Sequence, residues 1–434
     1  MSEKSQQFEV ADSLAELKWS SVHNWIAVSF IIGMFLEGYV FFISPLATSW
    51  VVVPKTLTDL LIAWSSIWLL IGSLITGVLS DLVGRRIVYI ISFIIFAIGG
   101  VGLIFSYSYV LILTFDALLN YAGGAEMQSI LTATHEIFPR KNRNRTFFLF
   151  MLALLIGEAT LGFVGLSTAF SSVAIQRLSV GVLLLPAIAA LIFTRLKVPE
   201  SVRWIEAKFG SEKAKNYVEQ HFGQVPTILP SRPKQPSKSL STSFKFIILL
   251  AAAFTNYAIY GFWVFTAGPI FFPTHTSMII ALGTGFEAIG AVPIFIFGSK
   301  LSKKALFLWA SVAEFLFSAI MFITEGIWSA NLNIFWVLYS LFNIVIIFQY
   351  VAEESLRPEL WPTKRRGTIL GLNRSIVLGA FAGLTFWVAT ITIDQYALFA
   401  TIIALLGLAA AIVWYIKGIE TGKDVSIGVA SGEE

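Results

Sequence analysis

Cysteine is absent from this chain of 434 residues, and histidine occurs only four times. The absence of cysteine excludes disulfides, thiol chemistry and metal sites with cysteine ligands. The four histidines show no spacing typical of metal ligands, so we expect neither a metal nor a cofactor. The sequence also lacks a Walker phosphate-binding loop and a nucleophile constellation, which argues against ATP-driven transport and against an enzyme.

Charged residues are scarce too. Asp, Glu, Lys and Arg make up 13% of the chain, about half of the share that is usual in a soluble domain. Hydrophobic residues make up 56%, with 38 phenylalanines, and the mean hydropathy is +0.79. A soluble fold of this length could not bury so much apolar surface, whereas lipid can surround it. The composition therefore indicates a membrane protein.

Twelve apolar runs are long enough to cross a membrane as helices, which takes about 20 residues each. They lie near residues 23–45, 58–80, 86–106, 108–135, 146–170, 176–196, 244–268, 276–298, 304–324, 332–356, 367–391 and 395–417. The runs predict an all-α protein with two six-helix halves, 23–196 and 244–417, and tails at 1–22 and 418–434. The linker between the halves, 197–243, contains Pro226, Pro230, Pro233 and Pro236 among serines and lysines.

The positions of Lys and Arg predict the orientation, because cytoplasmic loops carry an excess of these residues. If both termini are cytoplasmic, only Lys55 and Arg177 of the 30 basic residues lie in outer loops, and only Arg374 lies within a span. The first twenty residues lack the apolar core of a secretory signal. We therefore predict a multi-pass protein of the cell (plasma) membrane with both termini in the cytoplasm.

The loops of the two halves repeat each other. EIFPRKNRNR at 136–145 follows the fourth span, and ELWPTKRRG at 359–367 follows the tenth. GVLSDLVGRR at 77–86 follows the second span, and the weaker GSKLSKKA, which starts at Gly298, follows the eighth. Matching loops predict two pseudo-symmetric halves related by an axis along the membrane normal, with a binding site between them.

These motifs resemble those of the major facilitator superfamily. GVLSDLVGRR resembles its loop signature Gly-x-Leu-x-Asp-x-x-Gly-Arg-Arg. VPESVRWI at 198–205 resembles the PESPRWL signature of sugar porters, metabolite–proton symporters and organic-ion carriers, with Val202 in place of the second proline. The resemblance extends over nearly the whole chain. It implies twelve helices in two six-helix halves that alternate access to a central site.

The resemblance also implies a cytoplasmic gate. Opposite charges in the repeated loops could hold the halves together when the carrier faces outward. An exposed pair contributes only about 0–1 kcal/mol, whereas a network shielded by packing can bias a two-state equilibrium by more. The alternative is that the basic residues only fix the topology, which we favour for Arg140, Lys141 and Arg143. The predicted gate comprises Gly77, Asp81, Gly84, Arg85, Arg86, Glu136, Arg145, Glu200, Arg203, Glu359 and Arg366.

Acidic residues inside the spans are the most informative feature of the interior, because each costs about 2.5–3.5 kcal/mol at mid-membrane. With Arg374 as the only cation there, the excess of acid indicates proton coupling, cation binding or both. We expect Glu314 to be structural, since the ninth span is peripheral in the superfamily. The six acidic residues are Glu37, Asp116, Glu126, Glu158, Glu287 and Glu314.

Glu37, Asp116 and Glu126 are the predicted proton-coupling residues. Relatives of the metabolite–proton type pair an acid of the first span with an arginine of the fourth. In this sequence Glu37 lies near the first-span position, Asp116 replaces the arginine, and Glu126 keeps a later acid. We expect Glu37 and Asp116 to approach each other, so that one stays protonated. The alternative for Glu37 is a neutral, backbone-bonded role.

Candidate substrate ligands are polar and aromatic residues of the inner helices. Asn256, Tyr260 and Trp263 are spaced to lie near one face of the seventh span, and aromatic rings with an amide suit a small polar solute. Helix packing is the alternative explanation. The predicted set is Glu158, Asn256, Tyr257, Tyr260, Trp263, Glu287, Asn343, Gln349, Asn373 and Arg374.

Two further features bear on the solute. Arg374 could bind an anion or pair with Glu353 or Glu354. Ala153 stands where sugar porters usually carry a glutamine, which argues against a typical hexose site.

The leading hypothesis is a proton-coupled symporter of a small polar organic solute, either a sugar-like compound or an organic acid. An organic-cation carrier or drug/proton antiporter is the alternative, favoured by Glu158 and Glu287 without matching bases. A non-transporting nutrient sensor is a remote third. The expected partners are the solute, protons and the lipid bilayer, with no nucleic acid, and we expect a monomer.

Overall fold

The computed structural model describes residues 18–47, 50, 55–223 and 240–421, together with residues 10, 11, 13, 430 and 431. Every regular element in these residues is a helix. The proline-rich part of the predicted linker, which holds Pro226, Pro230, Pro233 and Pro236, lies outside the described residues, as does part of each predicted tail.

The first six predicted runs correspond to helices of the N-terminal half. The first run is divided at Phe42, and the other five are single helices. These elements are α2 (Ser21–Phe41), α3 (Ile43–Ala47), α4 (Lys55–Val83), α5 (Arg85–Ile104), α6 (Tyr109–Ile137), α7 (Arg140–Thr168) and α8 (Val173–Arg195).

The second six runs correspond to helices of the C-terminal half. They are α11 (Thr242–Tyr260), continued through the π-helical turn η1 (Gly261–Thr266) into α12 (Ala267–Phe271), then α13 (Thr276–Phe297), α14 (Lys303–Ile323), α16 (Leu332–Leu356), α17 (Arg366–Val388) and α18 (Ile393–Lys417). Short α15 (Glu325–Trp328) and four 3₁₀ turns (Pro273–His275, Gly298–Lys300, Arg357–Glu359 and Thr363–Arg365) connect them. Two further helices lie in the described part of the linker, α9 (Val202–Phe209) and α10 (Ser211–Phe222).

The helices have the length and composition of membrane spans. Eleven helical segments of the described residues are long and apolar enough to cross a membrane. The remaining long helix, α6, has 29 residues but is more polar, because it contains Asp116, Asn120 and Glu126. The fold is therefore an all-α polytopic one, as the sequence predicted.

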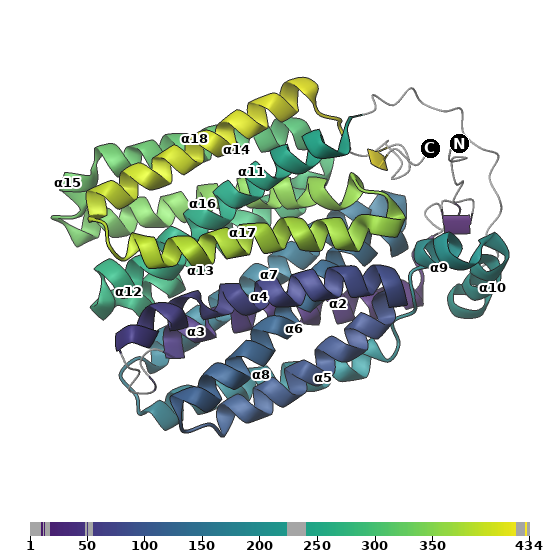
Figure 1. Cartoon of the computed structure of the whole chain (residues 1–434), viewed down its shortest axis with the longest axis horizontal. Helices are drawn as coiled ribbons and strands as arrows, with labels where there is room; N and C mark the ends of the chain where they lie inside the picture. The colour runs from purple at the N-terminus through teal and green to yellow at the C-terminus, as the bar shows by residue number, and fades with distance from the viewer. Residues whose placement is uncertain are drawn as a thin grey trace.

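The two halves lie against each other along their length. In Figure 1 the N-terminal helices (purple to blue) and the C-terminal helices (teal to yellow) run along the long axis of the molecule, and α9 and α10 lie beyond one end of the bundle. The most extensive helix contacts join α4 to α17 and α7 to α13, so both cross from one half to the other.

Glycines allow α4 and α17 to approach closely. A Cβ atom on Gly77 of α4 would lie 2.6 Å from the carbonyl oxygen of Gly367 and 3.1 Å from the Cα atom of Gly371, both on α17. Real Cβ atoms do not tolerate the shorter distance. A side chain at this point would therefore force the two helices apart at the end that carries the repeated loops.

We expect Gly77→Val to hold the two halves apart at this end. A backbone clash of this kind costs about 1–3 kcal/mol, so opening should become on the order of tenfold more frequent. The measurement is the maleimide labelling rate of Val351→Cys, a buried α16 position in a chain that has no cysteine of its own. Gly383→Val on α17 is the matched control, because nothing lies within 4 Å of its added Cβ. Equal labelling of both variants would show that the close approach of α4 and α17 does not control access.

Candidate functional site

A cavity lies at the junction of the two halves, near the middle of the bundle. About 470 Å³ between its side chains is free of atoms, but only about 30 Å³ admits the centre of a water molecule. That is room for water, so a larger solute requires the halves to separate. The lining residues are Glu37, Phe41, Leu69, Leu154, Leu155, Glu158, Asn256, Tyr257, Tyr260, Glu287, Ile346, Ile347, Tyr350 and Arg374.

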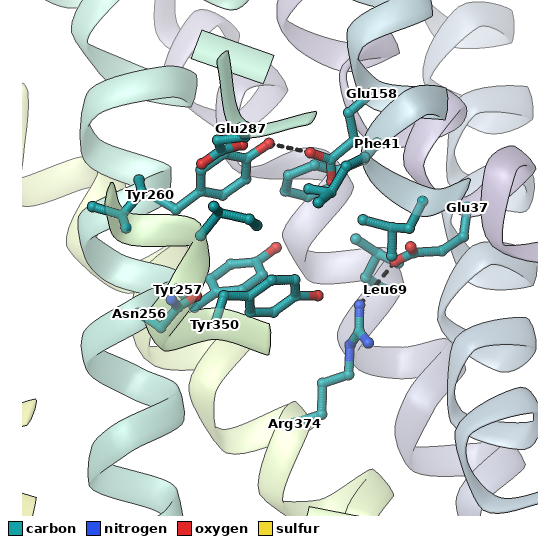
Figure 2. A pocket seen from close by; sticks show the side chains of 14 residues that line it. Glu37, Phe41, Leu69, Glu158, Asn256, Tyr257, Tyr260, Glu287, Tyr350 and Arg374 are labelled. Carbon is teal, nitrogen blue, oxygen red and sulfur yellow. Dashed lines mark hydrogen bonds and ion pairs between the residues drawn. The ribbon is translucent and has the colours of Figure 1, made fainter. Parts of the chain in front are cut away.

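An ion pair crosses this cavity from one half to the other. The guanidinium of Arg374, on α17, extends toward α2 and places Nη2 2.8 Å from Oε1 of Glu37 (Figure 2). Arg374 also contacts the Met127 sulfur atom of α6. The second carboxylate oxygen of Glu37, Oε2, is buried and has no hydrogen-bond partner in the described structure. Glu37 is therefore free to bind a proton or a donor group of a solute.

A second polar bridge crosses the cavity through Tyr260. The Tyr260 hydroxyl, on α11, donates a hydrogen bond to Glu158 of α7 in the opposite half. Glu287 of α13 lies beside the same hydroxyl (Figure 2) and also interacts with it. Two carboxyls from different halves therefore share one tyrosine.

Aromatic rings cover the cavity on the side away from α9 and α10. Phe41 and Phe42, at the end of α2, lie 5.0 and 5.5 Å from the ring of Phe265 in η1. Phe41 also lies 6.0 Å from Tyr257. Contacts of this kind close the cavity by apolar packing, without fixed polar bonds between the halves.

The opposite side is closed by buried charges around Glu136. Its carboxylate accepts hydrogen bonds from Arg85 Nε at 3.1 Å and Nη2 at 3.0 Å. It accepts another from Arg366 of the C-terminal half at 2.9 Å, and one from the Ser201 hydroxyl at 2.6 Å. Both guanidinium groups are fully buried. One carboxylate thus connects the two halves through bonds that exclude water.

Two further carboxylates bind helix N-termini in this region. Asp81 accepts hydrogen bonds from the backbone N–H groups of Gly367, at 3.2 Å, and Thr368, at 2.8 Å, where α17 begins. Glu200 accepts from the N–H groups of Arg85 and Arg86, at 2.9 and 3.1 Å, where α5 begins. A carboxylate is favourable at such positions because the exposed N–H groups carry partial positive charge. Burial nevertheless raises the pKa of Glu200 above its usual value.

The C-terminal half contains a counterpart of the Glu136 cluster. Lys303 Nζ lies 2.7 Å from Glu359. This ion pair corresponds to that of Arg85 with Glu136 in the N-terminal half. Arg143 of the N-terminal half interacts electrostatically with Glu359, as Arg366 does with Glu136. Arg143 was predicted to serve topology alone, but it is buried and faces this carboxylate.

Other predicted gate residues contribute less. Arg203 donates to Thr363 of the other half at 3.0 Å, and Gly84 has a φ of +100°, which favours glycine at the start of α5. The side chain of Arg86 is exposed. The guanidinium of Arg145 lies over the Phe295 ring, 5.7 Å from its centre.

The three predicted proton-coupling residues lie in separate environments, contrary to expectation. Glu37 faces Gly123 of α6, which is about 10 Å from Asp116 along the helix. Asp116 is bound by the Ser44 hydroxyl and by the Asn120 amide, the latter at 3.0 Å. Direct repulsion between Glu37 and Asp116 is therefore not a feature of this structure.

Glu126 has a partner that sequence analysis missed. It forms an ion pair with Arg195 at the end of α8, and Ser92 donates to its other oxygen. Arg195 also lies over the rings of Phe30 and Tyr89. Arg374 is consequently not the only buried cation. Arg195 lies at the end of the sixth predicted run, 176–196, which was the available signal, but it was counted among the cytoplasmic basic residues.

Four predicted substrate ligands lie outside the lining of this cavity. Trp263 packs against Trp328 and other aromatic rings. Asn343 donates to the carbonyl of Tyr339 on its own helix. The amide groups of the other two residues, Gln349 and Asn373, bind the Ala252 carbonyl and the Arg357 guanidinium, respectively.

Some residues at or near the cavity escaped prediction. Phe41 and Tyr350 contribute aromatic rings to the cavity. Arg357 pairs with Glu353 at 2.7 Å and also with Glu354, whereas Arg374 forms its ion pair with Glu37. The spacing of three and four residues between them was a usable signal.

Comparison with known proteins gives consistent results. A family model described as the Major Facilitator Superfamily matches residues 25–384. The chain is 24% identical to "Putative metabolite transport protein YaaU" of Escherichia coli (strain K12), over 91% of each chain. It is 22% identical to Glucose transporter GlcP of Staphylococcus epidermidis (strain ATCC 12228 / FDA PCI 1200), over 71% of this chain and 74% of the relative.

Solved structures show the same fold. The proton:xylose symporter XylE of E. coli, bound to 6-bromo-6-deoxy-D-glucose, superposes with a TM-score of 0.74 at 15% identity. The superposition covers 95% of this chain and 99% of that chain.

We expect Arg366→Ala to open the side of the molecule that carries the Glu136 cluster. Removing one partner of a buried ion pair costs about 3–5 kcal/mol, and part of this cost should appear as separation of the halves. The labelling rate of Val351→Cys should rise by about tenfold or more. Arg365→Ala is the control, because Arg365 is exposed. Unchanged labelling in Arg366→Ala would restrict Arg366 to a topological role.

Proposed function

The chain belongs to the major facilitator superfamily, and from this premise we propose that it is a proton-coupled symporter of a small polar organic solute of the sugar type. It is a multi-pass membrane transporter, and we place it in the cell membrane as a monomer with both termini in the cytoplasm. The Glu136 cluster then lies at the cytoplasmic face. The structure corresponds to a state in which the cytoplasmic side is closed.

The observation that carries this proposal is the Glu37–Arg374 ion pair. It lies in the central cavity and joins α2 of one half to α17 of the other at 2.8 Å. Since it contains a carboxylate that can be protonated, the charge state of Glu37 and the contact between the halves depend on each other.

Coupling follows from the competition for Arg374. In the empty carrier, ionised Glu37 pairs with Arg374 and lets the halves close for the return step. When a proton neutralises Glu37, Arg374 is released to bind the solute, which then bridges the halves in its place. A carrier that has bound only a proton has neither the Glu37–Arg374 ion pair nor a solute to connect its halves. A carrier that meets only solute has Arg374 still occupied by Glu37. Only the empty and fully loaded forms therefore change sides readily.

The lining supports a hydroxylated solute. Asn256, Tyr257, Tyr260 and Tyr350 offer hydrogen-bonding groups beside aromatic rings, a combination that suits small polar molecules. An organic acid fits less well, because the lining has three carboxyls and one cation, and that cation is paired. The relatives named as a metabolite transport protein, a glucose transporter and a proton:xylose symporter support the same class.

We expect reconstituted protein to accumulate its solute when an inward proton gradient is imposed on liposomes. A panel of radiolabelled sugars and related metabolites identifies the solute. A protonophore should abolish accumulation but leave exchange of labelled for unlabelled solute intact, because exchange needs no net proton movement. Accumulation that persists in the presence of the protonophore would contradict proton coupling.

We expect Glu37→Gln to lose proton-driven accumulation by at least about tenfold while it retains exchange. The amide resembles the protonated acid, so the loaded form still changes sides, but the empty form lacks its ion pair for the return step. Glu314→Gln is the matched control, because Glu314 is an equally buried carboxyl outside the cavity lining. Normal accumulation by Glu37→Gln would remove Glu37 from the coupling mechanism.

A further inference from the structure

The buried carboxyls of Glu158 and Glu287 lie near each other without a positively charged partner. They belong to opposite halves and are 5% and 2% exposed. The single hydroxyl proton of Tyr260 is donated to Glu158. Oε2 of Glu287 is buried and has no hydrogen-bond partner in the described part of the chain. Two buried carboxylates cannot both be ionised next to each other without a compensating charge.

The other ionisable groups nearby do not supply this charge. Arg374 is the cation of the lining, and it is bound to Glu37 on the far side of the cavity (Figure 2). Its charge acts on Glu158 from there, but the charge of Glu37 acts on Glu158 more strongly and in the opposite sense. The other ionisable neighbours are Tyr257, Tyr339 and Tyr350, which are neutral phenols, and the Asn256 amide of the lining is neutral too. A positive group is therefore missing between α7 and α13.

The surroundings suit a cation with an organic body. Rings of Phe41, Tyr257, Tyr260 and Tyr350 line the same cavity as the two carboxyls (Figure 2). The faces of aromatic rings attract cations, by about 0.5–2 kcal/mol each. An ammonium group next to Glu287 would have carboxylates on one side and ring faces on the other, and the remaining lining could bind hydroxyls.

We propose that Glu158, Tyr260 and Glu287 form a subsite for a protonated primary amine, so that the transported solute is a polyhydroxylated amine of the amino-sugar type. The subsite rests on the proposed transport function and specifies its substrate class.

The position of the subsite connects binding to closure. At the crossing of α7 and α13, a Cβ on Gly162 would lie 2.9 Å from Thr284 Oγ1 and 3.0 Å from the Cα of Ala281, so the helices are already in close contact. Glu158 is four residues before Gly162, and Glu287 is three residues after Thr284. An ammonium bound to both carboxyls therefore draws the two halves together around the solute.

The test uses purified full-length protein in detergent and matched ligand pairs that differ in one group. Glucosamine is compared with glucose, and galactosamine with galactose, by ligand-dependent thermal stabilisation. N-acetylglucosamine serves as a neutral comparison, because it carries an amide at the carbon where glucosamine carries its amine. We expect at least one amine to bind at least about tenfold more tightly than its alcohol and its neutral amide.

Variants assign the preference to the subsite. Glu287→Gln should reduce the preference for amine over alcohol by at least about tenfold, and Tyr260→Phe, which keeps the ring, should reduce it to a smaller degree. Glu314→Gln should keep the full preference. A cooperative melting transition without ligand shows that each variant is folded, and Glu158→Gln replaces Glu287→Gln if the latter is not.

The result that overturns the subsite is clear. If neither amine binds more tightly than its alcohol, or if the preference survives in the folded carboxyl variants, the amine subsite is wrong. Proton-driven uptake of a neutral sugar would also contradict it while leaving the symport proposal intact. If amine uptake does not depend on the proton gradient, the symport proposal is contradicted but the amine subsite is not.

Discussion

The carboxylate of Glu136 lies between two buried guanidinium groups that belong to different halves of the molecule, Arg85 and Arg366. A buried charge without a partner is costly, and removing one member of such a cluster leaves the others uncompensated. The halves therefore stay in contact at this face as long as the three groups remain in place. The central cavity is closed on this side because of that constraint, and Glu359 with Lys303 repeats the arrangement in the second half.

The buried carboxyls that have polar partners in the membrane-spanning region make contacts of two kinds. Within the N-terminal half, Glu126 pairs with Arg195, and Asp116 binds Ser44 and Asn120. These contacts move with one half and stabilise it as a rigid unit. Contacts that cross the cavity behave differently, because relative movement of the halves breaks or forms them. In the proposed mechanism an acid of the second kind, Glu37, links its protonation to the contact between the halves.

Much of the architecture could be predicted because it depends on local sequence. Apolar runs of sufficient length must become helices in lipid, where every backbone group needs an internal partner. The repeated loops indicated two halves, and their motifs assigned Asp81, Arg85 and Glu136 to one predicted charge network. Contacts between distant residues were harder to predict. The pairing of Glu126 with Arg195 and that of Arg357 with two glutamates escaped notice, since charge alone does not choose among several possible partners.

The sequence by itself determined the all-α membrane fold, the division into halves and the set of acidic residues that need partners. Hydrophobic length and loop charge are properties of consecutive residues, so they can be read without coordinates. Only the tertiary structure decided which acid meets which base, because helix rotation determines which side chains face the cavity. It turned Glu37 toward Arg374 rather than Asp116 and kept Trp263 in the core. It also brought Glu158 and Glu287 to the same tyrosine.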